Sequence, residues 1–227
     1  MYFTSKEIQK ILKISGCELM HQRLAGKLNY SKKGNAYLYE IPLDHALLKH
    51  PLYCKLINWF ENKHPMDLNN APQQRASQIE IMRIIKDILL PIEKHLGEVT
   101  ITYGFNSAKL NTYIQANNPN GTSPKLDQHS SFEVNSLGNR ISENDGFACD
   151  FYVKGYEQKM GEVVKFITNK LNFDKIYFYG CSRPVHVSVS SSPQHHLQLM
   201  LESENGRRVP GRKAYGEQAK FLAERLQ

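Results

Sequence analysis

The feature that most restricts the fold is a change of hydrophobic period near residue 97. From Gln78 to about Leu96, apolar side chains recur at helical spacing, and this pattern stops at Gly97. The next residues, VTITYGF, alternate as the two faces of a β-strand do. The chain therefore predicts a helix followed directly by a strand.

The segments that follow continue this mixture of helices and strands. The patterns predict a helix over 107–115, a strand ending at Cys149–Asp150–Phe151, a helix over 155–171, and neighbouring strands over 175–180 and 184–192. Helices interleaved with short strands are typical of an α+β domain. We expect a small, mainly antiparallel sheet flanked by helices.

The N-terminal region has a different pattern. It predicts a helix from about residue 4, a turn at Ser15–Gly16, a second helix ending at Gly26, and two short strands around a Lys-Lys-Gly-Asn turn. This order resembles a winged helix-turn-helix of the excisionase or MerR type. The resemblance implies that the second helix enters the major groove of DNA, with Arg23, Lys32 and Lys33 near nucleic acid. A helical subdomain packed on the main domain explains the pattern equally well.

Residues 43–66 predict a further helix, and residues 66–77 predict a linker or loop. We therefore expect a helix-turn-helix-like region over 1–66 and a second domain over 67–227 that ends in a basic tail.

The net charge of +7 favours anionic partners such as nucleic acid or acidic cell-wall polymer, although it serves solubility as often. The four cysteines form no C-x-x-C pair, which favours free thiols in a reducing compartment. The sequence shows neither a secretory signal nor an apolar run of membrane-spanning length. We expect a cytoplasmic protein that does not insert into a membrane.

Three residues that lie far apart in the sequence have the chemistry of zinc ligands. His129 lies in a polar stretch, Asp150 ends a strand of small residues, and His186 lies in an alternating strand. Catalytic zinc is bound by three such nitrogen and carboxylate ligands. Spacing alone leaves three unrelated polar residues as the alternative.

The stretch LGEVTITYGFNSAKLN resembles the strand–turn–helix of zinc D-alanyl-D-alanine carboxypeptidases and endopeptidases, a superfamily that shares its fold with the Hedgehog signalling domain. The family's three later motifs are matched, in order, by Asp127-Gln128-His129, by Gly146 to Asp150, and by Pro184 to Val187. The resemblance spans about residues 79–190. It implies that His129, Asp150 and His186 bind Zn²⁺, and that a metal-activated water cleaves an amide bond in a peptide or peptidoglycan-like substrate.

The chain departs from this family at two functional positions. Phe105-Asn106-Ser107 stands where the family has Tyr-Arg-Ser, so Asn106 offers a hydrogen bond without a charge, and Ser107 stays a candidate for contact with substrate. The family's acidic general base before the last histidine is also missing. Candidates elsewhere are Glu133, Glu143, Asp145 and the pair His195–His196.

A third departure is the long insertion between His129 and Asp150. Arg140 within it, and Arg183 near the last histidine, are candidates to replace the missing cationic clamp, or are solvated loop arginines. Three functions remain open: a zinc-dependent peptidase or amidase, a DNA-associated protein with a repurposed zinc domain, and a pseudo-enzyme whose zinc only holds the fold.

Overall fold

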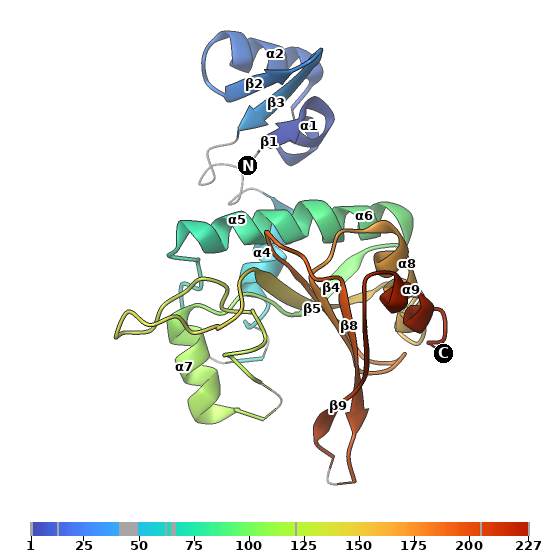
Figure 1. Ribbon diagram of the computed structural model, residues 1–227. Coiled ribbons are helices and arrows are strands. Elements are labelled where there is room, and N and C mark those ends of the chain that lie inside the picture. Colours follow the sequence, from blue (N-terminus) through green and yellow to red (C-terminus); the bar gives the residue numbers. More distant parts are fainter. Residues whose placement is uncertain are drawn as a thin grey trace. The chain divides into compact units, whose positions relative to one another are not determined.

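The computed structural model describes residues 2–12, 14–40, 50–61, 63–64, 67–120, 122–204 and 206–226 (Figure 1). Contacts within the chain divide it into two units, Met1–Cys54 and Lys55–Gln227. The division falls inside helix α4 (Pro51–Asn58), before the boundary expected after residue 66. Of the helix expected over 43–66, residues 43–49, 62, 65 and 66 lie outside the described part.

The first unit pairs two helices with a three-stranded sheet. Its elements are β1 (Tyr2–Thr4), α1 (Ser5–Leu12), α2 (Gly16–Leu24), β2 (Asn29–Lys33) and β3 (Ala36–Glu40). Ser15 begins α2 as its N-cap, because its hydroxyl oxygen accepts the backbone N–H of Glu18 at 3.1 Å. The sheet order is β1-β3-β2, with both pairs antiparallel. The predicted order of helix, helix and hairpin is confirmed, and β1 is an added strand.

The second unit is built on a six-stranded sheet. Its strands are β4 (Val99–Tyr103), β5 (Phe147–Val153), β6 (Lys175–Phe178), β7 (Val185–Val189), β8 (His196–Glu202) and β9 (Arg208–Tyr215). They lie in the order β4-β5-β7-β6-β8-β9, and each neighbouring pair is antiparallel except β6 and β8. This confirms a mixed α+β domain with a mainly antiparallel sheet.

Helices pack along the sheet of the second unit. The second unit begins within α4, at Lys55. Its further helices are α5 (Arg75–Ile84), the π-helical turn η1 (Ile85–Leu89), α6 (Leu90–His95), α7 (Ala108–Asn117), α8 (Met160–Lys170) and α9 (Glu217–Ala223). Helix α5 packs against β5 and β7, α8 against β5 and β6, and α9 against β8 and β9.

The alternation along β5 and β7 separates the hydrophobic core from the polar face of the sheet. Phe151 pairs with Val185 and both side chains are fully buried, whereas the next pair along the ladder is Asp150 with His186. Because successive side chains point to opposite faces, the sheet holds its apolar core on one side and this polar pair on the other.

A second hydrophobic cluster holds the turn that follows β4. Trp59, Phe60, Leu110 and Ile114 form its buried centre. The Trp59 indole N–H and the Asn70 side-chain amide both donate to the carbonyl oxygen of Phe105, at 2.9 and 2.7 Å. These bonds fix the Phe105-Asn106-Ser107 turn against α4 and α7.

The last part of the chain departs from expectation. The stretch expected as a basic tail contains strand β9 and helix α9, and β9 pairs with β8 at the edge of the sheet. The insertion after His129 contains a single isolated bridge, between Val134 and Arg140, within the segment described. Among the helices that the structure describes, none is long and apolar enough to cross a membrane.

Candidate metal centre

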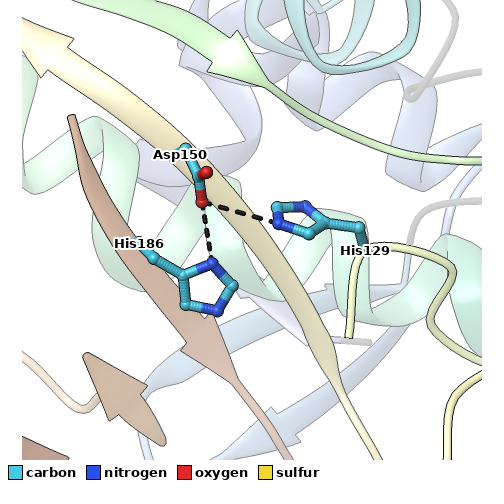
Figure 2. Close-up of side chains that lie close together, drawn as sticks. All are labelled: His129, Asp150 and His186. Atoms are coloured by element: carbon cyan, nitrogen blue, oxygen red, sulfur yellow. Dashed lines mark hydrogen bonds and ion pairs between the residues drawn. The ribbon is translucent and has the colours of Figure 1, made fainter. Parts of the chain in front are cut away.

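The second unit brings His129, Asp150 and His186 together, and we call them the His–Asp–His group (Figure 2). One nitrogen or oxygen from each residue lies within 4.8 Å of the other two. The Asp150 carboxylate stands between the rings: its Oδ1 is 2.7 Å from Nδ1 of His186 and 3.5 Å from Nε2 of His129. Among the residues described, this is the one group of three with metal-binding chemistry.

The sheet register places two of these residues opposite each other. Asp150 and His186 are cross-strand partners on β5 and β7, so their side chains leave the same face of the sheet. His129 comes from the loop after α7, and its carbonyl oxygen accepts the backbone N–H of Asn106 at 3.1 Å. This bond ties the loop to the turn after β4.

A β-bulge brings an aromatic ring beside the group. The pairing of β4 with β5 shifts between Ile101 and Tyr103, so that Tyr103 lies opposite Asp150. The Tyr103 ring then lies edge-on to the His129 ring, with centroids 4.5 Å apart. On the other side, the Tyr177 ring stacks on the His186 ring at 4.7 Å.

A backbone contact sets the tautomer of His129. Its Nδ1 lies 3.1 Å from the carbonyl oxygen of Gly104, which only accepts hydrogen bonds. Nδ1 therefore carries a proton, and Nε2 is the ring nitrogen that faces Asp150. A hydrogen bond of this kind orients metal-binding histidines in many proteins. Gly104 has no room for a side chain, since a Cβ there would collide with the carbonyl oxygen of Leu56.

Charge compensation keeps the carboxylate ionised. Burial alone would raise the pKa of Asp150, but the His186 and His129 imidazoles hold that pKa below its usual range. Burial opposes the charged form of His129, yet the Asp150 carboxylate raises the pKa of His129 overall. Nε2 of His186 is buried without a hydrogen-bond partner among the described residues. Two imidazole nitrogens and one carboxylate are the donor set that catalytic zinc uses, so the residues fit such an ion.

The His–Asp–His group lines a cavity of about 350 Å³, which we call the metal cavity. Asp127 is the other carboxylate on its wall, and its oxygens accept the backbone N–H groups of His129 at 3.3 Å and Ser123 at 3.1 Å. Other polar residues on the wall are Tyr103, Tyr177, Tyr179, His196, Gln198 and Arg208.

Four of the residues predicted as candidate acid–base groups lie outside the lining of this cavity: Glu133, Glu143, Asp145 and His195. The Glu133 carboxylate is buried and accepts the backbone N–H groups of Gln73 and Gln74 at 3.0 to 3.3 Å, just before α5 begins. The His195 ring hydrogen-bonds to Asn172 through Nε2 at 2.8 Å and lines a different cavity. Of the predicted pair of histidines, His196 is the one that faces the metal cavity.

The turn after β4 has mainly structural contacts. The Asn106 side-chain N–H donates to the Tyr103 hydroxyl at 2.9 Å, one step away from the His–Asp–His group. Ser107 is the N-cap of α7, where its hydroxyl oxygen accepts the N–H of Leu110. Its own N–H donates to the Asn70 side chain at 2.8 Å.

The two predicted arginines have separate positions. Arg140 pairs with Asp145 at 2.6 Å and lies over the Phe132 ring, inside the insertion. Arg183 lines a larger groove beside the metal cavity, together with Asp150. The arginine that does reach the metal cavity is Arg208, which sequence reasoning missed because it lies in the supposed tail.

In the first unit, Arg23 stacks on an aromatic ring. Its guanidinium carbon is 3.7 Å from the centroid of Tyr37, and the Lys32 ammonium is 5.8 Å from the same centroid. Lys32 and Lys33 lie exposed at the end of β2, before the hairpin turn at Gly34. The three predicted nucleic-acid-binding residues thus come from the last turn of α2 and from the adjacent hairpin.

Comparison of the chain with models of known families, with curated proteins and with solved structures finds no match.

Proposed function

We propose that the second unit is a zinc-dependent hydrolase of the D,D-peptidase type, which cleaves an amide or peptide bond with a metal-activated water. The observation that carries the proposal is the His–Asp–His group on the wall of a cavity large enough for part of a peptide. A zinc ion bound there would act as a Lewis acid on the scissile carbonyl and would activate a water.

Asp127 is the group that we propose as proton acceptor. It lines the metal cavity, and each of its oxygens accepts one backbone N–H. Each oxygen therefore keeps a lone pair for the proton of a water molecule. Asp127 thus supplies the carboxylate that hydrolysis needs and that the segment before His186 lacks.

Tyr103 is the group that we propose as donor to the carbonyl oxygen of the substrate. Its hydroxyl oxygen accepts the Asn106 N–H, which leaves its own O–H free to donate into the cavity. Burial raises the pKa of Tyr103, so the hydroxyl keeps its proton at neutral pH. A neutral donor would replace the arginine that the resembled family has in this turn.

Metal content of the purified full-length chain tests the site. We expect about one zinc per chain for the natural sequence and loss of the metal in Asp150→Ala and His186→Ala. Asp127→Asn is the matched control, since it should keep the metal while losing release of free amine from a panel of short peptides. No bound metal in the natural sequence, with both alanine variants folded, would overturn the proposal.

Full metal occupancy without amide cleavage on any peptide of the panel would instead favour a pseudo-enzyme, in which zinc holds the fold and the cavity binds a ligand.

A second candidate function concerns the first unit. Its stacked Arg23, with Lys32 and Lys33 on the neighbouring hairpin, favours contact with the phosphates of duplex DNA. The test is a mobility shift of duplex DNA. Lys32→Glu with Lys33→Glu should abolish the shift, rising salt should weaken it, and the exposed Lys6→Glu on α1 should leave it unchanged. Equal loss in the Lys6 variant would reduce the effect to net charge.

A further inference from the structure

A second, larger groove adjoins the metal cavity, and we call it the outer groove. Its volume is about 1070 Å³, and it shares Asp150, Tyr179 and Arg208 with the wall of the metal cavity. Because the outer groove and the metal cavity share these wall residues, a polypeptide bound in the outer groove would reach the His–Asp–His group without leaving the protein surface.

The charges that line the outer groove are almost all positive. Lys63, Arg183, Arg207 and Arg208 lie on its wall. Among the described residues that line it, the sole carboxylate is that of Asp150, whose Oδ1 lies 2.7 Å from Nδ1 of His186 and 3.5 Å from Nε2 of His129. The groove therefore presents a net positive field next to the candidate metal centre.

These cations differ in how far they are neutralised. Arg208 pairs with Glu202 at 2.8 Å, but the Glu202 side chain is 59% exposed, so water weakens that pair. Arg183 and Arg207 are exposed, and within the described part of the chain neither has an ion pair with a carboxylate. Each of their guanidinium groups can donate two parallel hydrogen bonds to one carboxylate.

The rest of the wall suits a polypeptide. Tyr152, Tyr179, Pro184 and Met200 give it apolar surface, and the Tyr152 hydroxyl is held by donation to the carbonyl oxygen of Ser182 at 2.9 Å. Carboxylates on a bound chain would face the arginines while its backbone and apolar atoms contact this surface.

We infer that the outer groove binds an acidic stretch of a polypeptide substrate, with its carboxylates on Arg183, Arg207 and Arg208. The bond to be cleaved then lies beside that stretch, over the His–Asp–His group. The choice of a peptide rests on the proposed amide hydrolysis, whereas the binding of acidic groups rests on the groove alone.

Fluorescence anisotropy with labelled hexaglutamate tests the inference on the full-length chain. Arg183→Glu combined with Arg207→Glu should weaken binding by about 10-fold or more at low salt, and the effect should shrink as salt screens it. The matched control is Lys109→Glu combined with Lys154→Glu. It makes the same change in net charge at two exposed lysines that line neither hollow, and should change affinity by less than about 3-fold.

Three outcomes would overturn the inference: hexaglutamate that binds no better than a neutral peptide, an equal loss in both double variants, or tighter binding of oligothymidylate with the same dependence on Arg183 and Arg207. The last would assign the groove to single-stranded nucleic acid.

His186→Ala separates this inference from the proposed function, because His186 belongs to the His–Asp–His group but does not line the outer groove. Hexaglutamate binding that survives in His186→Ala supports the groove whether or not the natural protein cleaves any peptide. Binding that is lost together with the metal would place the anion on the metal and overturn the groove.

Discussion

The His–Asp–His group and the outer groove share Asp150 and use charge in opposite ways. In the group, the half-buried Asp150 carboxylate stands between two buried imidazoles, with oxygen–nitrogen distances of 2.7 and 3.5 Å. In the groove, Arg183 and Arg207 are exposed and lack a carboxylate partner among the described residues.

The charged residues of the two regions therefore have different effects: those of the group fix the geometry of a site, and those of the groove attract anions. The side chains of the group are held in contact with one another by β5, β7 and the loop that contains His129, so they contribute a defined geometry. Exposed, uncompensated charges contribute a field that acts over several ångströms and weakens with salt. Changes at the group should therefore act through structure and metal affinity, and changes at the groove through affinity for anions.

The largest effect is expected where strand geometry holds the group. Gly146 precedes β5 with a φ of +103°, and a Cβ there would collide with the carbonyl oxygen of Val189 on β7. Gly146→Ala should lower the free energy of unfolding by about 3–5 kcal/mol. Urea unfolding followed by the fluorescence of Trp59, the chain's one tryptophan, measures it.

Gly155→Ala is the matched control, because Gly155 has a φ of +85° and open space around it. It should cost about 1–2 kcal/mol. An equal loss of stability at the two glycines would mean that the close contact between Gly146 and Val189 does not restrict how β5 and β7 pair, and so does not fix the position of Asp150.

A smaller loss is expected at Glu133, a buried charge outside both regions. Glu133→Gln weakens the hydrogen bonds to the backbone N–H groups of Gln73 and Gln74, and should lower stability by about 1.5–3 kcal/mol. Zinc content should not change. Loss of peptide cleavage at unchanged stability would instead support Glu133 as the general base and contradict its purely structural role.

A pH effect is expected at His196, which lines the metal cavity. Burial, followed by the charges of Lys175 and Lys213, lowers the pKa of His196 below its ordinary value of 6.5. The unfolded chain then binds the proton more readily, so His196 lowers stability as pH falls below 6.5 and has no effect well above it. His196→Gln should make the acid-side loss of stability shallower, as measured by urea unfolding at a series of pH values. An identical pH profile for the variant would contradict this.

The smallest effect is expected at the edge of the outer groove. Glu202→Gln frees Arg208 from an exposed ion pair worth at most about 1 kcal/mol, so hexaglutamate should bind up to about 5-fold more tightly. Glu162→Gln, at an exposed position on α8, is the control for net charge. An equal gain in both variants would show that the groove responds only to total charge.

The His–Asp–His group could be predicted only through the resemblance of short motifs to the zinc D-alanyl-D-alanine peptidases, because spacing alone left its three members as unrelated polar residues. Asp150 and His186 lie in strands whose alternation is visible in the sequence, and His129 follows a recognisable strand–turn–helix. Apart from β1, the order of the described helices and strands up to β7 followed from the hydrophobic periodicities of the sequence.

The outer groove could not be predicted, because its cations come from segments that only tertiary structure brings together. Strand β9 contains Pro210 and Gly211 among basic residues, which is a pattern typical of a loop or tail. Its pairing with β8 is also interrupted by a register shift. The parallel pairing of β8 with β6 is not local in sequence. The role of Glu133 was hidden for the same reason, since its partners are 59 and 60 residues away.

The direct pairing of Asp150 with His186 has a consequence for how this chain can change over generations. Since side chains alternate along a strand, gain or loss of one residue inside β5 or β7 would turn Asp150 or His186 toward the opposite face of the sheet. The insertion over 130–145 is not part of a regular strand, so a change in its length does not reverse the direction of the side chains in β5 or β7. Descendants of this sequence should therefore differ in length within that insertion, while Phe147–Val153 and Val185–Val189 keep their number of residues.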